Sequence, residues 1–340
     1  MRAAGLLGLM LSGCAIAGRY AGDRDLPPPV LFQESSTVGF SVSDQFSHSS
    51  GEVFEARPAL HFYLYDGLQN DDIWRRGGWG MTVSGTFLST ARMLRDESAP
   101  VRVPSYNPRI KVQEIHLQRI GGGKNPDALL LGMQFHLGHY SNGQDGCGYA
   151  GHTRNPNPAQ ADGDFGPLSC PGAGTDLNLV NGSFSLDYLR LDIVSAYWTK
   201  VSSDDERGLR TPAWDFSATA GVQWNGLPGP GSMDPVLEDR YGLWAIPVEL
   251  QVEHFTCVEK QHSVRMTLAT VLHLPRQSEV WGSAELTLAY IFKRLGVGGF
   301  VRGRVGRDEL NMRFEQTRND LTVGLLLDPN TVPDLKPVLH

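Results

Sequence analysis

Residues 127–145, DALLLGMQFHLGHYSNGQD, decide the fold that the sequence predicts. Alternate residues of a strand share a face. One face of this strand carries an apolar row, formed by Leu129, Leu131, Met133, Phe135 and Leu137. The other face is mostly polar or small, with Gln134, His136, Gly138 and Tyr140. The apolar row continues into His139 and Ser141, so a histidine and a serine lie side by side at the end of an apolar face.

His139 and Ser141 have two interpretations. A serine next to a histidine can act as a nucleophile activated by a general base. The same pair can also form a polar rim, solvated where the strand leaves an apolar environment. The spacing alone leaves both interpretations open.

Composition limits the classes of function. The formal net charge of −7 provides no basic field for nucleic acid, so no nucleic-acid partner is expected. The chain has 39 glycines and 9% aromatic residues, which suits many strands joined by tight turns. No apolar run is long enough for a membrane-spanning helix. A transmembrane β-barrel needs only short alternating segments, so a membrane protein of that kind stays open.

The first residues are typical of an export signal. A short apolar segment at 3–10 follows Arg2, and two cleavage patterns compete. LSGC at 11–14 fits a lipoprotein signal with lipidation of Cys14, whereas AIA at 15–17 fits an ordinary signal-peptidase site. We therefore assign 1–17 to a signal peptide or lipoprotein signal. Three consecutive prolines make 18–35 a tether.

The remaining cysteines have different environments. Cys147 and Cys170 flank a segment rich in Gly, Pro and Asn. In an exported protein they are expected to form a disulfide, worth roughly 3 kcal/mol. Free thiols or a metal site are the alternatives, and no Cys-x-x-Cys spacing supports a metal. Cys257 has no partner in this scheme.

Strand-like stretches recur between the tether and a proline-rich extension at 329–340. They are predicted at 36–46, 52–66, 76–89, 107–120, 127–141, 183–198, 213–224, 241–254, 262–274, 280–293, 297–306 and 311–328. Alternation alone does not tell a soluble barrel from a membrane barrel. The export signal, the even number of strands and the long polar loops favour an outer-membrane barrel over 36–328.

Further polar residues are expected near His139 and Ser141. If strand 127–141 ascends and 183–198 descends beside it, then Ser183, Ser185 and Asp187 share the face of the apolar row. The turn after Ser141 also contains Asp145 and close backbone carbonyls. A hard cation such as calcium takes oxygen ligands of this kind, although a simple polar turn has the same composition.

The run His139–Gly143, HYSNG, resembles the His-x-Ser-Asn-Gly motif of the outer-membrane phospholipase A family. Three further segments resemble that family in the same order, namely 98–108, 282–290 and 308–328. The resemblance implies a twelve-stranded antiparallel transmembrane β-barrel in the outer membrane of a Gram-negative bacterium. It also implies hydrolysis of phospholipid acyl esters of the A1/A2 type, calcium dependence and a homodimer.

The resemblance also implies roles for the residues. Ser141 is the expected nucleophile and His139 its base. Asp187 stands where the family has an asparagine that orients the histidine, and a carboxylate accepts the ring N–H equally well. Ser185, on the same face, is the fallback for this third position.

The calcium ligands implied by the resemblance are Ala99, Gln144, Ser183 and Asp145. Here the chain departs from the family, because a family aspartate aligns with Gly146 and Asp145 comes one residue early. The external loop is longer, and the chain continues beyond the last strand. The altered calcium loop and the longer external loop support an alternative function as a catalytically impaired barrel with a structural or interaction role. A third hypothesis is a pore.

Overall fold

The computed structural model describes the barrel strands and part of their connections. The described residues are 33–41, 52–69, 73, 77–94, 101–121, 127–144, 177, 183–199, 203–204, 208–209, 213–228, 233, 235–255, 262–274, 281–293, 295–309, 314 and 316–329. Cys14, Cys147, Cys170 and Cys257 lie outside them, as do 1–17 and nearly all of 18–35 and 329–340. The disulfide, the lipidation and the division of the chain into segments therefore stay predictions.

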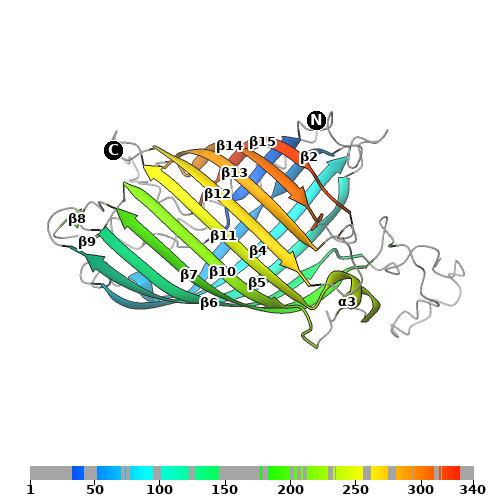
Figure 1. Cartoon of the computed structure of the whole chain (residues 1–340), viewed down its shortest axis with the longest axis horizontal. Helices are drawn as coiled ribbons and strands as arrows, with labels where there is room; N and C mark the ends of the chain where they lie inside the picture. Colours follow the sequence, from blue (N-terminus) through cyan, green and yellow to red (C-terminus); the bar gives the residue numbers. More distant parts are fainter. Residues whose placement is uncertain are drawn as a thin grey trace, which may run out of the picture.

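The described strands form a closed antiparallel barrel of 12 strands (Figure 1). Its strand segments, of which β2 and β3 belong to one barrel strand, are β1 (Ser36–Ser41), β2 (Glu52–Arg57), β3 (Ala59–Asp66), β4 (Gly78–Leu94), β5 (Val101–Ile120), β6 (Asp127–Ser141), β7 (Ser185–Thr199), β10 (Trp214–Trp224), β11 (Trp244–Phe255), β12 (His262–His273), β13 (Gly282–Phe292), β14 (Val297–Gly306) and β15 (Asp320–Leu327). The first strand closes the barrel by pairing with the last, with Val38 opposite Leu325. The predicted fold class is confirmed.

The segments β2 and β3 are two halves of one barrel strand, and both pair with β4. Pro58 separates them because proline has no N–H to donate to the sheet. The Pro58 carbonyl still accepts a hydrogen bond from the Ser89 N–H at 3.1 Å. The predicted strand 52–66 therefore runs along β4 without a break in its path, but its hydrogen bonding is interrupted at Pro58.

Short elements lie at the two ends of the barrel. The helix α3 (Pro235–Tyr241) and the hairpin of β8 (Ser203–Asp204) and β9 (Gly208–Leu209) lie at opposite ends in Figure 1. A short 3-10 helix, η2 (Gly67–Gln69), follows β3. None of the helices in the described part of the chain is long and apolar enough to cross a membrane.

Two predicted strand boundaries are wrong. The predicted strand 241–254 starts too early, since Tyr241 ends α3 and Gly242 then takes a φ of 102°. The predicted strand 311–328 also starts too early. Phe314 is fully buried, and Arg307 forms an isolated bridge with Thr317, so this segment folds back before β15 begins.

Most other predicted strands differ from the observed ones by a few residues. The strands 127–141 and 297–306 are confirmed to the residue. The described part of the first strand ends at Ser41, and 42–51 lie outside the described residues. The strands β4 and β5 are longer than predicted. β4 ends later and β5 begins earlier, so both extend toward the connection between them.

The two faces of β6 have opposite environments. The side chains of the apolar row point outward, and Met133 is 53% exposed on the exterior. Gln134 and His136 point into the barrel, where both are buried. An apolar exterior around a polar interior is the arrangement that lipid requires and the reverse of a soluble barrel. The exterior of this barrel is therefore its lipid-facing surface.

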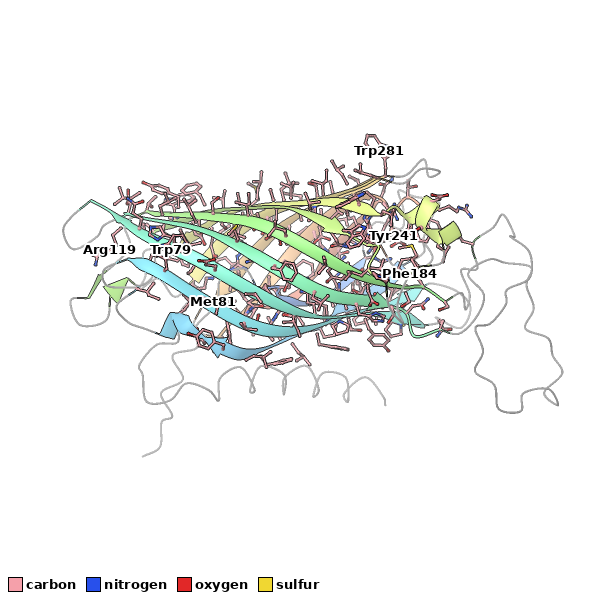
Figure 2. The ribbon with its side chains drawn as sticks, turned by 90° about the horizontal axis from the view of Figure 1, so that it is seen from below. Trp79, Met81, Arg119, Phe184, Tyr241 and Trp281 are labelled. Carbon is pink, nitrogen blue, oxygen red and sulfur yellow. The ribbon has the colours of Figure 1, made fainter. Side chains whose placement is uncertain are left out.

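Exposed aromatic residues gather near both ends of this surface. Trp79 and Trp214 lie toward one end, whereas Trp244 and Trp281 lie toward the other, beside the partly exposed Trp224. Figure 2 shows Trp79 and Trp281 at opposite ends of the barrel. Tryptophan prefers the two membrane–water interfaces, so these residues mark where the strands leave the hydrocarbon region. Ser141 ends β6 toward Trp224, and we call this end of the barrel the Ser141 end.

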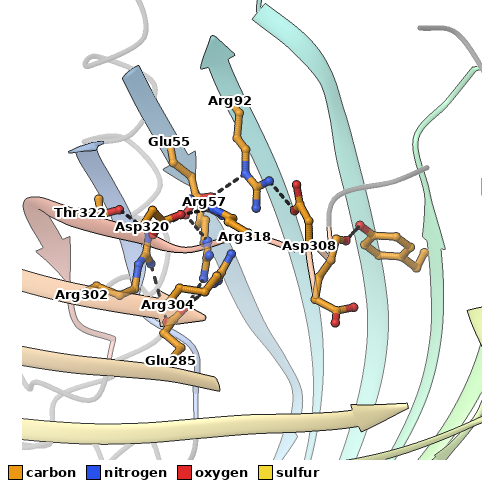
Figure 3. A network of polar contacts seen from close by, with 12 residues as sticks. Glu55, Arg57, Arg92, Glu285, Arg302, Arg304, Asp308, Arg318, Asp320 and Thr322 are labelled. Atoms are coloured by element: carbon orange, nitrogen blue, oxygen red, sulfur yellow. Dashed lines mark hydrogen bonds and ion pairs between the residues drawn. The ribbon is translucent and has the colours of Figure 1, made fainter. Parts of the chain in front are cut away.

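A network of charged residues fills the interior where the barrel closes (Figure 3). Glu55 is its centre, 1% exposed, and its carboxylate pairs with four guanidinium groups at 2.5–2.8 Å. These groups belong to Arg57, Arg92, Arg302 and Arg318. Arg92 also pairs with Asp308 at 2.6 Å. The network therefore joins β2, β4 and β14 to the segment that precedes β15.

An apolar plug lies inside the barrel at the Ser141 end. Its members come from β7, α3 and the connections, namely Phe184, Leu186, Tyr188, Met233, Leu237, Tyr241 and Phe314. The Arg307 guanidinium lies 4.5 Å from the centre of the Tyr241 ring and donates to the Tyr241 carbonyl at 3.0 Å. Burial raises the pKa of Tyr241 well above its usual value, so the phenol stays neutral within the plug.

Candidate active site

The register between β6 and β7 brings the predicted site residues together. His139 lies directly opposite Asp187, and Ser141 lies opposite Ser185. Directly opposed residues in an antiparallel pair point to the same side of the sheet. All four residues therefore lie on the lipid-facing surface, at the level where β6 ends.

His139 and Asp187 form a direct side-chain contact. The distance between His139 Nδ1 and Asp187 Oδ1 is 2.7 Å, and both side chains are partly exposed. Because a carboxylate only accepts, the Nδ1–H donates and the ring is held in one tautomer and orientation. In the neutral ring, the other nitrogen, Nε2, is then an acceptor. This is the state that a general base needs.

The turn after Ser141 is fixed by Asn142. The buried Asn142 side chain accepts hydrogen bonds from the Phe184 N–H at 3.0 Å and the Gln144 N–H at 3.2 Å. The Asn142 N–H in turn donates to the Phe184 carbonyl at 3.0 Å. Gly143 follows with a φ of 63°, a conformation that glycine adopts without strain. The Asn-Gly pair therefore fixes the backbone beside Ser141 against the start of β7.

The same turn presents a backbone donor next to Ser141. The Asn142 and Gln144 N–H groups are already used inside the turn. In the described part of the chain, the Gly143 N–H donates to no acceptor. An N–H group fixed in this way can stabilise negative charge on an oxygen bound near Ser141.

Tyr140 anchors the site strand from inside the barrel. It lies between His139 and Ser141 in sequence and faces the interior. Its hydroxyl donates to the Glu309 carbonyl at 2.7 Å, and its ring packs edge-on against Phe184 with 5.6 Å between centres. The lipid-facing residues on either side are therefore attached to the plug.

The predicted calcium ligands are only partly described. Ala99 and Asp145 lie outside the described residues, as does Gly146. Gln144 and Ser183 lie at the Ser141 end and offer neutral oxygen atoms of the kind that calcium accepts. The described residues contain no group of three or more His, Cys, Asp or Glu side chains that could hold a metal ion. Two neutral oxygens are compatible with calcium but supply none of the negative charge that the ion prefers.

The closed barrel, its apolar exterior and its aromatic ends define a transmembrane β-barrel of the outer-membrane class. Its structure is similar to that of outer membrane phospholipase A from Escherichia coli, with 12% identity, a TM-score of 0.49, and coverage of 94% of this chain and 98% of that chain.

Two further solved structures are similar. One is the Salmonella typhi outer membrane phospholipase dimer with bound calcium, with 14% identity, a TM-score of 0.46, and coverage of 87% of this chain and 91% of that chain. The other is the transport unit of the autotransporter AIDA-I from Escherichia coli, with 8% identity, a TM-score of 0.32, and coverage of 94% of this chain and 95% of that chain. No protein-family model and no curated protein matches the sequence. No activity follows from similarities at this level.

The residues that support the site from inside the barrel were not predicted. The contact between Tyr140 and Glu309 joins positions 169 residues apart, and no local sequence pattern predicts it. Asn142 had a detectable signal, because Asn-Gly after a strand favours a tight turn. Its hydrogen bonds to Phe184 depend on the pairing of β6 with β7, which the spacing alone does not determine.

Proposed function

We propose that this barrel is an outer-membrane phospholipase that hydrolyses acyl esters of membrane phospholipids. The observation that carries the proposal is the 2.7 Å contact between His139 and Asp187 on the lipid-facing surface. His139 is two residues from Ser141, on the same face of β6. A nucleophile, a base and a group that orients the base are the minimum set for acyl transfer through a serine. Their position on the exterior suits a substrate that diffuses within the bilayer.

The residues have separate tasks in the reaction. Asp187 holds His139 through Nδ1–H, so that Nε2 removes the proton of the Ser141 hydroxyl. The Ser141 oxygen attacks the acyl carbonyl, and the Gly143 N–H donates to the resulting oxyanion. Collapse of this intermediate breaks the ester bond, and His139 gives its proton to the leaving alcohol, the lysophospholipid. Water then attacks the acyl-serine by the same route and releases the fatty acid.

Calcium and a homodimer belong to the proposal as further parts. Gln144 and Ser183, together with Ala99 and Asp145, would hold the ion near the Gly143 turn. A bound calcium ion would add positive charge near the oxyanion. The proposed location is the outer membrane of a Gram-negative bacterium, in contact with membrane phospholipids.

Hydrolysis of phosphatidylcholine by the purified protein in detergent micelles tests the proposal. Replacing Ser141→Ala is expected to lower kcat by at least about 10³-fold, because the nucleophile is lost. The matched control is Ser195→Ala, which removes a serine on the same face of β7, opposite Leu131 and far from the site. If Ser141→Ala and Ser195→Ala have the activity of the unmodified chain, then Ser141 is not the nucleophile.

A fluorophosphonate probe separates this function from the catalytically impaired barrel. The probe reacts with a serine that a neighbouring base activates. Labelling of the unmodified chain that is absent in Ser141→Ala supports the hydrolase. A folded barrel that the probe leaves unlabelled, with and without calcium, supports a structural or interaction role.

A further inference from the structure

A tyrosine inside the barrel lies directly behind the contact between His139 and Asp187. Tyr188 follows Asp187 on β7, points into the barrel and is 3% exposed. Its partner in the register of the sheet is Gly138, the residue before His139. The pair of Gly138 and Tyr188 is therefore the next pair along the two strands from the proposed catalytic pair, and it lies on the opposite face of the sheet.

The Tyr188 ring crosses Gly138 and reaches β5. Its hydroxyl donates to Asn107 Oδ1 at 2.8 Å and accepts a hydrogen bond from the Arg109 guanidinium. Arg109 is in register with Gly138 on the other side of β6. One side chain of β7 thus extends over β6 and is bonded to β5, so it connects the three strands that surround the proposed site.

Gly138 leaves the space that this ring occupies. A Cβ atom placed on Gly138 would be 2.6 Å from Tyr188 Cε1, and nearer still to Cζ and the hydroxyl oxygen. Carbon atoms in contact are normally about 3.5–4.0 Å apart. The ring could move aside only by giving up its bonds to Asn107 and Arg109. A side chain at this position would therefore displace either the ring or the strand β6 itself.

The backbone pairing of β5 with β6 is interrupted at the same level. The ladder omits the two positions before Arg109, although it resumes at Tyr106. One of the two is Pro108, which the register of the flanking pairs places opposite His139 and which has no N–H to donate. The strand of the proposed base therefore has fewer backbone bonds on its β5 side, where the Tyr188 hydroxyl bonds to β5 instead.

Catalysis by a general base depends on where its ring lies, because a misplacement of about 1 Å can cost on the order of 10²-fold in rate. Resting on the proposed function, we infer that Tyr188 is a positioning residue for the reaction. Held over Gly138 by its bonds to β5, the ring fixes β6 against β7 at the level where His139 meets Asp187. It lies inside the barrel, away from substrate and reacting atoms, and acts through the orientation of His139.

Hydrolysis of phosphatidylcholine in detergent micelles tests the inference. Tyr188→Phe keeps the ring and removes the hydroxyl, so kcat is expected to fall between about 3-fold and 10²-fold, within the range of a misplacement of up to 1 Å. KM is expected to stay nearly unchanged, because the surface that meets the substrate is not altered. Tyr197→Phe is the matched control, since its hydroxyl bonds to Asp127 at the opposite end of the barrel. Its kcat is expected to equal that of the unmodified chain.

A second background separates positioning from a general effect on the fold. In Asp187→Ala the orienting contact is already lost, so adding Tyr188→Phe is expected to lower kcat by less than about twofold more, because changes that act through one contact are not additive. A role that does not act through this contact would lower kcat by the same factor in both backgrounds. An equal fall in both, or no fall in either, overturns the inference.

Gly138→Ala tests the same contact from the side of β6. It is expected to lower kcat at least as much as Tyr188→Phe, whereas Gly303→Ala, where an added Cβ meets nothing within 4 Å, is expected to leave kcat unchanged. Full activity of a folded Gly138→Ala barrel would overturn the inference, and if this variant does not fold, the two backgrounds of Tyr188→Phe decide.

The proposed function and the positioning role fail in different ways. Hydrolysis that Ser141→Ala abolishes and Tyr188→Phe leaves intact refutes only the positioning role. Absence of hydrolysis by the unmodified chain, or full activity of Ser141→Ala, refutes the proposed function and the inference with it.

Discussion

The Tyr140 hydroxyl donates to the Glu309 carbonyl at 2.7 Å, and this bond attaches the strand of His139 and Ser141 to the segment between β14 and β15. Tyr140→Phe removes the hydroxyl and keeps the ring. The expected loss of unfolding free energy is about 0.5–1.5 kcal/mol, the net value of one hydrogen bond, with a further cost from the unsatisfied carbonyl. Urea unfolding in detergent measures it.

The control for Tyr140→Phe is Tyr197→Phe. The Tyr197 hydroxyl also makes a hydrogen bond, to Asp127 at 2.6 Å, but on the exposed surface. Solvent replaces a bond there at little cost, so a smaller loss is expected. Equal losses in the two variants would mean that the link to Glu309 adds no stability of its own.

The contact between Asp187 and His139 predicts a graded series of activities. Asp187→Asn keeps an acceptor for the Nδ1–H but removes the charge that stabilises protonated His139, so kcat is expected to fall, and by less than in Asp187→Ala. Asp187→Ala removes the acceptor as well and is expected to lower kcat by about 10²- to 10³-fold. Ser185→Ala is expected to lose less than Asp187→Ala. The reverse order would assign the orienting role to Ser185.

The buried Glu55 carboxylate predicts a large loss of stability. Glu55→Gln leaves four guanidinium groups without their common partner. Removing one side of a buried ion pair costs about 3–5 kcal/mol, because the remaining charge stays desolvated. Glu238→Gln, on the partly exposed helix α3, is the control and is expected to change unfolding by less than about 0.5 kcal/mol. Comparable midpoints for the two variants would show that the network does not stabilise the barrel.

Glu309 predicts how stability depends on acid. Burial raises the pKa of this carboxyl, but His273, 3.2 Å away, and Arg307 attract its charge more strongly, so the pKa is lowered overall. The stabilisation is fully present above the ordinary glutamate pKa of about 4.3 and is lost as the pH falls through the lower folded-state value. Glu309→Gln should remove this part of the acid sensitivity, which lies below the ordinary glutamate pKa of about 4.3, measured by unfolding at each pH. An identical pH profile in the variant would contradict the assignment.

The plug makes a prediction about the pore hypothesis. Phe314 is fully buried between Phe184 and Tyr241, with ring centres 5.8 and 5.2 Å away. These apolar side chains occupy part of the interior at the Ser141 end, where a channel would need a polar lining. The barrel is therefore expected to show no steady single-channel conductance in a planar bilayer. Discrete open channels of the unmodified chain would restore the pore as a function.

The alternation of β6 predicted most of what the strand does. Its two ends, its lipid-facing row and the side on which His139 and Ser141 lie follow from a period of two. The period also placed Asp187 on the same face of the neighbouring strand. The structure adds the register between the strands, which puts His139 opposite Asp187. Register depends on the connection between the strands, which alternation does not specify.

The interior was harder to predict because its contacts are not periodic. Phe314 lies in the predicted strand 311–328, and Arg307 lies between that strand and 297–306. The segment folds inward, where Phe314 is buried in the plug and Arg307 contacts the rings of Tyr241 and Phe314. The helix α3 has only 7 residues, too short for a helical period to appear. Pro58 was visible in the sequence, but its effect is only a missing hydrogen bond in an otherwise continuous strand.

Glu55 also has a consequence for how the barrel enters the membrane. Its partners come from the second barrel strand, from β4, from β14 and from the segment before β15, so both ends of the chain supply them. An open sheet that lacks its last strands would carry the charges of Glu55, Arg57 and Arg92 without Arg302 and Arg318, together with unpaired backbone edges, into hydrocarbon, and both are unfavourable. Insertion into the bilayer and closure of the barrel are thereby coupled. A chain truncated before β14 is therefore expected to have no stable membrane-embedded state, even though its remaining strands are unchanged.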